Sequence, residues 1–384
     1  MREPSGAPMV GKDLKVAIVH DDFIQEGGAE RLVLAMLEIW PHSDLYAVIS
    51  SGPWRSRVKS FFGKEIRTTW LQKLPFRETL FRFYYLFYPL AIESFNFDRY
   101  DLVISSSARY AHGVITKPGT LHLSYVNSPA RFLYQKDLTP KLPFARLITL
   151  WHKSWDRVAA WRPDYIVANS QTPAKRIKKF WKREVDSVIY PFVDWPDIDP
   201  SVPNPGREKG SYFLLISRLN GWKKVDLAVK VFSLINRPLY IIGIGPERKR
   251  LEKIAGPSVK FLGSVSDTGK FQYLTFCQAL IVTQEEDFGI VTLEANICGR
   301  PVIAYGAGGS SELIKDGVNG ILFDDQTVDG LNEALVRFDQ TAFSRENCIN
   351  AAKSFGKERF KAELYGFVSS KLADRPDTHL GPVL

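Results

Sequence analysis

The strongest constraint on the fold is a repeated alternation of short apolar runs with helical patterns. The runs are four or five residues long and rich in Val, Ile and Leu, and most lead into sequence with a helical pattern. Such runs are typical of buried parallel strands, and strands that alternate with helices predict parallel sheets wound by right-handed crossovers. The predicted strands are 15–19, 101–105, 164–168, 212–216, 239–242, 259–262, 279–282 and 301–304.

A proline-rich break divides this alternation into two parts. Residues 195–206 contain four prolines and end in Gly206, so they can continue neither a helix nor a strand. At about 100–200 residues per domain, the length of the chain also favours two domains. We therefore predict an α/β protein with two Rossmann-like, doubly wound parallel-sheet domains that face a cleft. The predicted ranges are 13–195 for the N-terminal domain, 196–210 for the linker, 211–355 for the C-terminal domain and 356–384 for a final helix and tail.

Composition narrows the class of protein further. The formal net charge of +9 calls for an anionic partner, which could be nucleic acid, a phosphorylated small molecule or a membrane surface, unless it serves only solubility. The longest uncharged apolar candidate, residues 83–92, is too short for a membrane-spanning helix and contains Pro89. The first twelve residues lack the apolar core of a signal peptide, and we expect a loose extension there.

The cysteines indicate the compartment. There are three, far apart in the chain, and neither a Cys-x-x-Cys pair nor a Cys/His cluster accompanies them. The sequence thus supports neither a disulfide framework nor a zinc site, and a cytoplasmic location fits best. The three are Cys277, Cys298 and Cys348.

The most informative motif is the stretch from Glu285 to Glu312, EEDFGIVTLEANICGRPVIAYGAGGSSE. A turn at Asp-Phe-Gly is predicted to precede a helix over 290–298, which Gly299 ends. Glu286 and Glu294 are eight residues apart and could share one side of a helix, with the backbone N–H groups of residues 288–290 between them. Amides flanked by carboxylates suit a nucleotide sugar, since amides bind phosphate and carboxylates bind hydroxyls. The alternative is that Glu286 caps the helix and Glu294 lies on a solvated face.

A second group of residues is basic. Arg218 follows a predicted strand directly, and Lys223 lies five residues on at the entry to the next helix. Two cations at the carboxyl end of a parallel strand could neutralise a leaving diphosphate without a metal ion. A solvated basic loop is the alternative, and Lys224 fits that description.

A glycine pair follows the first predicted strand. Gly27 and Gly28 leave the backbone open to a phosphate or an acceptor sugar, although such a pair is often only a tight turn. His20 is predicted to end the same strand near Gly28. It is a candidate site residue on the acceptor side, but a lone histidine is more often structural.

Taken in order, these residues resemble the family 4 glycosyltransferases, which adopt the GT-B fold and retain anomeric configuration. The similarity runs from about Lys15 to Phe367, and the bacterial mannosyltransferases of O-antigen and exopolysaccharide assembly are most similar. The block Glu285-Glu-Asp-Phe-Gly-Ile290 with Glu294 is its most specific part. Further matching segments are 19–21, 27–31, 100–107, 169–170, 188–194, 217–219, 261–263 and 308–309.

The resemblance implies a role for each motif. Glu294 would hold the nucleotide ribose and Glu286 the hydroxyls of the donor sugar, while Arg218 and Lys223 would stabilise the departing diphosphate. The amides of Phe288, Gly289 and Ile290 would bind sugar and phosphate, and Gly28 would lie near the diphosphate and acceptor. The implied donor is GDP-mannose and the implied acceptor a lipid-pyrophosphate-linked glycan in cell-surface polysaccharide synthesis. No metal or other cofactor is expected, and a helix near the C-terminus would cross back onto the first domain.

One position departs from the family pattern. Relatives usually read His-Thr-Pro where this chain has Asn127-Ser-Pro129. Asn127 can donate and accept hydrogen bonds, but it cannot titrate or carry charge. A retaining glycosyltransferase remains the first hypothesis. The second is a catalytically impaired relative that binds a nucleotide sugar or a partner protein. His122 is expected to lie within a strand of its own and not to take the place of the histidine that relatives have at position 127.

A basic and aromatic segment extends from residue 55 to residue 85. It carries eight Lys or Arg against two Glu, and aromatic residues are interleaved with them, among them Trp70, Phe76, Phe81, Phe83, Tyr84 and Tyr85. Such a mixture suits an anionic bilayer surface on the inner face of the cell membrane. The alternative, that the aromatics fill the core beneath a solvated charged face, has equal weight. Single-stranded nucleic acid stands well behind both, so we expect no nucleic-acid partner.

Overall fold

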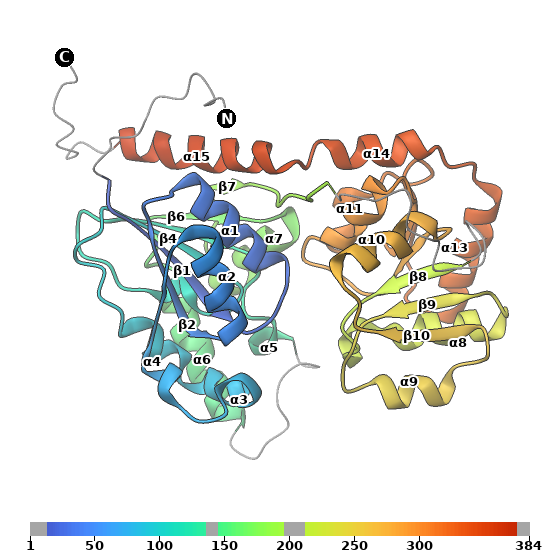
Figure 1. Cartoon of the computed structure of the whole chain (residues 1–384), viewed down its shortest axis with the longest axis horizontal. Helices are drawn as coiled ribbons and strands as arrows, with labels where there is room; N and C mark the ends of the chain where they lie inside the picture. The colour runs from blue at the N-terminus through green and yellow to red at the C-terminus, as the bar shows by residue number, and fades with distance from the viewer. Residues whose placement is uncertain (1–13, 136–144, 196–211, 375–384) are drawn as a thin grey trace. The chain divides into compact units, whose positions relative to one another are not determined.

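The computed structural model describes residues 14–135, 145–195 and 212–374 (Figure 1). These residues form two compact units, one of residues 1–189 and 360–384 and the other of residues 190–359. The predicted linker, 196–210, and the end of the predicted tail, 375–384, lie outside the described residues. Among the helices in the described ranges, none has both the length and the apolar character needed to cross a bilayer.

The first unit is built on a parallel sheet, which in the described residues has seven strands in the order β3-β2-β1-β4-β5-β6-β7. Every strand pairing in it is parallel. The strands are β1 (Val16–Phe23), β2 (Asp44–Ser50), β3 (Ile66–Thr68), β4 (Leu102–Ser107), β5 (Leu121–Val126), β6 (Tyr165–Ala168) and β7 (Ser187–Val188). The central strands β1, β4 and β5 are buried along their whole length, although some of their residues, such as His122 and Ser124 of β5, are polar.

Helices connect these strands as the crossovers of a parallel sheet require. The helices of this unit are α1 (Gly28–Ile39), α2 (Gly52–Phe62), α3 (Arg77–Tyr84), α4 (Tyr88–Glu93), α5 (Arg131–Tyr134), α6 (Ala145–Ala159), α7 (Gln171–Trp181) and, from Phe360 on, α15 (Lys357–Ala373). Short 3₁₀ turns are η1 (Trp70–Lys73), η2 (Tyr85–Phe87) and η3 (Ala111–Gly113). Phe360, Leu364 and Val368 of α15 are buried, with the Phe360 ring 5.8 Å from that of Tyr125 in β5.

The second unit repeats this architecture. In the described residues its sheet has six strands in the order β10-β9-β8-β11-β12-β13, all parallel. The strands are β8 (Phe213–Ile216), β9 (Leu239–Ile242), β10 (Val259–Gly263), β11 (Leu280–Val282), β12 (Val302–Tyr305) and β13 (Gly320–Phe323). The helices are η5 (Gly221–Lys223), α8 (Val225–Leu234), α9 (Arg248–Ile254), α10 (Asp267–Phe276), α11 (Ile290–Ile297), α12 (Ser310–Leu313), α13 (Val328–Gln340) and α14 (Arg345–Lys353).

The eight predicted strands are all present, as β1, β4, β6 and β8 to β12. The prediction of an α/β protein with two doubly wound parallel-sheet domains is therefore confirmed, and the architecture is consistent with a GT-B fold. The predicted domain limits stay predictions. The three cysteines are free and buried, and burial raises the pKa of the Cys277 thiol to about 12.

Candidate active site

Each sheet has one point where the direction of winding reverses. In the first unit it lies between β1 and β4, and in the second between β8 and β11. Ligands of doubly wound sheets bind outside the carboxyl ends of the strands at such switch points. Most of the site residues predicted from the sequence lie on strand ends and loops at these two places, so each unit is described in turn.

At the switch point of the second unit, Lys223 and Glu286 form an ion pair. Lys223 ends η5 after β8, Glu286 follows β11, and the Lys223 Nζ lies 2.7 Å from Glu286 Oε1. Gln284 donates a hydrogen bond to the same oxygen. Lys223 is only 7% exposed, and its carbonyl accepts a hydrogen bond of 3.0 Å from the Thr283 hydroxyl. An ammonium and a carboxylate are thus fixed together at the carboxyl edge of the sheet, where doubly wound sheets bind their ligands.

The loop that carries Glu286 is held by the glycines that follow β12. Glu286 forms a β-bridge with Gly308, and the Gly309 N–H donates to the Glu286 carbonyl at 2.8 Å. Gly308 has φ +71°, and a Cβ on it would collide with the Glu286 carbonyl oxygen. A Cβ on Gly309 would likewise collide with Phe288. The glycine pair therefore sets the position of the Glu286 loop, a role that the sequence did not reveal.

The helix that follows begins where the sequence predicts it. α11 starts at Ile290 with Gly289 as its N-cap at φ +94°, so Glu286 lies just before the helix and Glu294 within it. The alternative that Glu286 caps the helix is therefore wrong. The backbone of Phe288, Gly289 and Ile290 leads into the first turn, as expected, and Gly299 has the left-handed conformation predicted at the end.

Glu294 is paired with a residue that the sequence analysis missed. It is 2% exposed, which excludes the solvated face considered above, and its Oε1 accepts from Lys270 Nζ at 2.7 Å. Lys270 lies on α10, whose N-cap Ser266 follows β10. The position of Lys270, although not its pairing with Glu294, could have been predicted from the sequence, because a lysine soon after a predicted strand lies near the carboxyl edge of the sheet.

The two other predicted cations lie near Lys223. Arg218 is the second residue after β8 and is exposed, while its carbonyl accepts from the Asn220 N–H at 2.8 Å. Lys224 is exposed with φ +51° at the start of α8, which agrees with a solvated position. The roles of Arg218, Lys223, Glu286 and Glu294 in catalysis and binding stay predictions.

In the first unit, Ser106 brings together two of the predicted residues. The Ser106 carbonyl lies 3.0 Å from His20 Nδ1, and its hydroxyl accepts from Asn127 Nδ2 at 3.2 Å. β1 continues to Phe23, so the prediction that His20 ends this strand is wrong, and His20 is buried within it. Asn127 directly follows β5, and its own N–H donates to the Ser107 carbonyl at 2.7 Å. His122 is buried within β5, as expected.

Gly27 and Gly28 begin α1 beside this cluster. Gly27 is the N-cap and Gly28 the first helical residue of α1, which continues to Ile39. Glu30 in the first turn is buried, and its Oε1 lies 3.9 Å from His20 Nε2. Burial alone would lower the pKa of His20, but the hydrogen bond and charge of Glu30, with the charges of Asp21 and Asp22, outweigh it, so the pKa is raised above 6.5.

Two carboxylates next to His20 have buried partners of their own. Asp21 accepts backbone N–H bonds from residues 108 to 111, at 2.6 to 2.9 Å. Asp22 pairs with Arg109 and accepts from the Tyr88 hydroxyl at 3.2 Å. Burial raises the pKa of Asp22, whereas for Asp21 the charges of Arg109 and His20 and the amide bonds outweigh burial and lower it. These contacts fix the loop after β4 against the end of β1.

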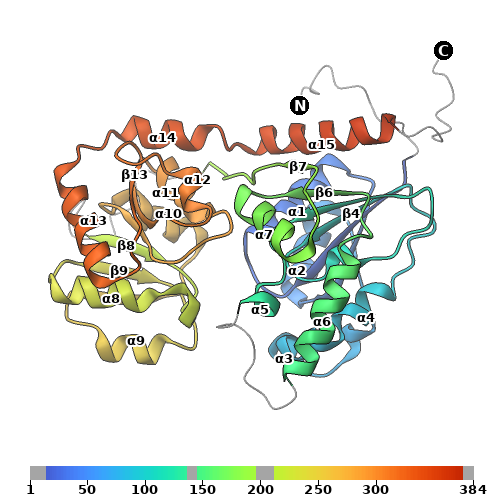
Figure 2. The same cartoon turned by 180° about the vertical axis from the view of Figure 1, so that it is seen from behind.

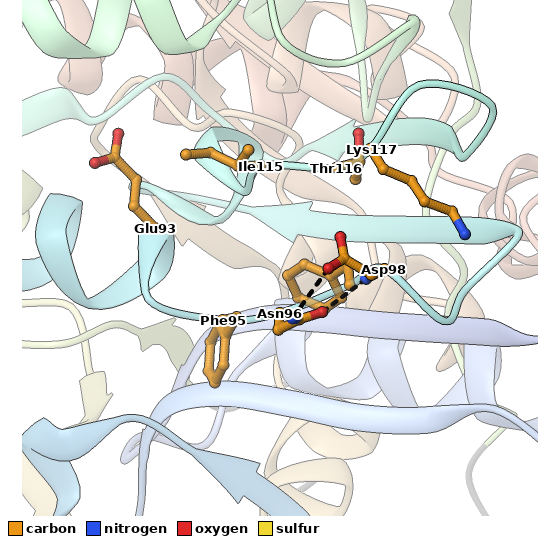
Figure 3. A pocket seen from close by; sticks show the side chains of 8 residues that line it. Glu93, Phe95, Asn96, Asp98, Ile115, Thr116 and Lys117 are labelled. Carbon is orange, nitrogen blue, oxygen red and sulfur yellow. Dashed lines mark hydrogen bonds between the residues drawn. The ribbon is translucent and has the colours of Figure 1, made fainter.

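A separate pocket of about 290 Å³ lies elsewhere in the first unit (Figure 3). Its walls come from the segments that lead into β4 and β5, at the amino ends of these strands. Asn96 and Asp98 hydrogen bond to each other within it, at 2.8 and 3.1 Å. Because it lies away from the carboxyl ends, this pocket is not the candidate site.

Comparison with known proteins shows similarity to glycosyltransferases. Residues 200–355 match the family described as "Glycosyl transferases group 1". Among curated proteins, the alpha-1,3/1,6-mannosyltransferase ALG2 of Homo sapiens is 29% identical over 246 residues, which are 54% of this chain and 59% of that protein. The uncharacterized glycosyltransferase MJ1069 of Methanocaldococcus jannaschii is 24% identical over 238 residues, 56% of this chain and 59% of that protein. The chain thus spans less than two thirds of these relatives.

Solved structures support the fold over almost the whole chain. Anabaena Alr3699/HepE in complex with UDP has a TM-score of 0.68 at 19% identity, covering 93% of this chain and 100% of that one. Sucrose-phosphate synthase from Thermosynechococcus elongatus has a TM-score of 0.70 at 17% identity, covering 94% and 100%. These structures support the fold alone. The region that matches the group 1 glycosyltransferase family contains both Lys223 and Glu286.

Proposed function

We propose that this protein is a retaining, metal-independent glycosyltransferase that moves mannose from GDP-mannose onto a lipid-pyrophosphate-linked glycan at the cytoplasmic face of the cell membrane. The observation that carries the proposal is the pair of the buried Lys223 with the half-buried Glu286 at the switch point of the second sheet. Mannose as the donor sugar is supported by the similarity to the human mannosyltransferase ALG2. The structures of HepE with UDP and with UDP-glucose make UDP the competing nucleotide.

The chemistry follows from the side chains. As the bond between sugar and diphosphate breaks, negative charge grows on the leaving phosphate, and Lys223 with Arg218 would stabilise it. Glu286 would bind hydroxyls of the donor sugar, and Lys223 would orient its carboxylate. Glu294 would bind hydroxyls of the ribose, and Lys270 would orient its carboxylate. Two cations acting on the diphosphate make a divalent metal ion unnecessary.

The first experiment is a thermal-shift series with GDP, UDP and ADP, followed by transfer from GDP-mannose to extracted lipid-linked acceptor in EDTA. We expect stabilisation by GDP and transfer of mannose with retained anomeric configuration. Dependence on an added divalent metal would reject the metal-free mechanism, and stabilisation by UDP alone would replace GDP-mannose with a uridine donor.

A second candidate is a catalytically impaired relative that binds a nucleotide sugar or a partner. It is motivated by Asn127, which cannot titrate and whose side-chain amide donates to Ser106. The test compares transfer by the wild type with transfer by Asn127→His. Tight donor binding without transfer or donor hydrolysis in either protein would favour this second function.

A further inference from the structure

Helix α6 of the first unit has an inverted distribution of side chains. Its exposed residues are largely apolar, with Leu147 69% and Val158 68% exposed, whereas His152 and Asp156 are buried. Asp156 accepts from the Tyr134 hydroxyl at 2.6 Å and from Trp181 Nε1 at 2.5 Å. A surface helix of a globular protein normally shows the opposite distribution, with its apolar stripe facing the core. A contiguous exposed apolar face marks an interaction surface.

The exposed face of α6 is also cationic at one edge. At about 100° per residue, Leu147, Leu150, Trp151 and Val158 fall within one arc of the helix. Arg146, Lys153 and Arg157 fall next to it on one side. The only acidic residue of α6 is the buried Asp156. The face therefore combines apolar and basic groups with no exposed carboxylate of its own.

A second set of exposed apolar residues comes from the basic and aromatic segment and its continuation. Phe76 and Phe83 at the two ends of α3 are 74% and 70% exposed, and Leu90 of α4 is exposed as well. Phe76 has φ +50°, which is uncommon for a bulky residue. Phe81, by contrast, is buried. Some aromatics of the segment therefore fill the core, and others are exposed to solvent.

The two sets lie on neighbouring elements. Trp155 of α6 donates to Glu93 at the end of α4 at 2.7 Å. The Tyr110 ring lies 5.5 Å from Trp155 and 6.2 Å from Tyr88 of α4. Both views place α3, α4 and α6 at the same end of the first unit (Figures 1 and 2). We call this the outer surface, and its exposed apolar members are Trp70, Phe76, Phe83, Leu86, Phe87, Leu90, Leu147, Ile148, Leu150, Trp151 and Val158.

We infer that the outer surface docks onto an anionic lipid bilayer. Aromatic and aliphatic side chains beside Lys and Arg are the combination that inserts into the boundary between headgroups and acyl chains. Aliphatic residues such as Leu147 and Leu150 offer nothing for stacking on nucleic-acid bases. A second copy of this chain would bring like charges together. The inference deepens the proposed function and rests on it for the membrane location, but its test needs neither donor nor transfer.

The experiment measures cosedimentation of the full chain, without nucleotide, with two kinds of vesicle. One kind is phosphatidylcholine alone and the other is phosphatidylcholine mixed with phosphatidylglycerol. We expect binding to the mixed vesicles, weakened by salt. Leu147→Ser/Leu150→Ser should reduce affinity at least about 10-fold, because two inserted side chains are lost. Arg146→Gln should reduce it about 5-fold, the equivalent of roughly 1 kcal/mol for a cation near the surface.

Matched controls lie on the second unit. Leu234 is exposed on α8 and Lys249 on α9, so Leu234→Ser and Lys249→Gln should bind as the wild type does. Circular dichroism checks that every variant is folded. No cosedimentation, or equal binding by the wild type and Leu147→Ser/Leu150→Ser, would overturn the inference. A concentration-dependent dimer that the double variant abolishes would also overturn it, by assigning the surface to a second copy. If the wild type binds the vesicles but transfers no sugar, the result counts against the proposed function and not against this inference.

Discussion

The two switch points place their charged side chains in different surroundings. In the second unit, each carboxylate of interest pairs with one lysine, Glu286 with Lys223 and Glu294 with Lys270. In the first unit, Asp21 is completely buried and is satisfied by four backbone N–H groups. A side-chain pair can exchange one partner for a ligand, whereas a carboxylate that holds a loop cannot leave it without breaking the loop. We therefore expect the paired carboxylates of the second unit to bind a ligand, and Asp21 of the first unit to hold its loop in place.

The largest effect is expected from Asp21→Ala. The substitution leaves buried backbone N–H groups without an acceptor, at about 1–3 kcal/mol each, so the first unit should lose at least about 3 kcal/mol of unfolding free energy. The measurement is denaturant unfolding followed by circular dichroism and tryptophan fluorescence. Asp101→Ala is the control, because this exposed carboxylate accepts only the Lys15 N–H at 3.0 Å. A loss no larger than that of Asp101→Ala would show that Asp21 is not needed to hold the loop.

Lys223→Met should have the next largest effect. We expect it to lower the turnover number and not the free energy of unfolding. Removing a cation that stabilises charge in the transition state typically costs about 10²–10³-fold in kcat. Lys224→Met is the matched control, since Lys224 is adjacent and exposed and should retain wild-type turnover. Single-turnover transfer under saturating donor separates the chemical step from binding. Equal turnover in the two variants would contradict the role of Lys223.

The sequence predicted the sheets better than it predicted the site. Strands buried on both faces, such as β8 and β11, appear as apolar runs, and each of the eight predicted runs is a strand. β2 and β13 were missed, although β2 is also a buried, largely apolar run. β5 was harder to recognise, because His122 and Ser124 are polar yet fully buried. Glu286 and Lys223 were found from their places after strands, but their pairing depends on how the loops after β8 and β11 fold. The pairing of Glu294 with Lys270 joins positions on two helices, and no local pattern reports such a contact.

Lys270→Met should affect nucleotide binding more moderately. Without its ammonium, the Glu294 carboxylate loses the group that orients it, and we expect nucleotide affinity to fall about 10-fold, or about 1.4 kcal/mol. Isothermal titration with the nucleotide identified by thermal shift measures the change, with Lys249→Met as an exposed control. Glu294→Gln should weaken binding by at least as much. The effects of the two substitutions should not add in the double variant, because the residues form one pair. Additive losses would show that Lys270 acts independently of Glu294.

The smallest effect is expected from His20, and it tests whether the first switch point is charged at neutral pH. Its folded pKa lies above the usual 6.5, so its contribution to stability is complete below about pH 6.5 and is lost as pH rises through the folded value. The melting temperature of the wild type should therefore fall more steeply above neutral pH than that of His20→Gln. His122→Gln is the control, because burial, with the charges of His112, Arg183 and Arg162, lowers the pKa of His122 to about 3, and its imidazole is neutral throughout this range. If the melting temperature of His20→Gln falls with pH as steeply as that of the wild type, Glu30 does not hold a charged imidazole. The contrast between the two switch points would then rest on Asp21, Asp22 and Arg109 alone.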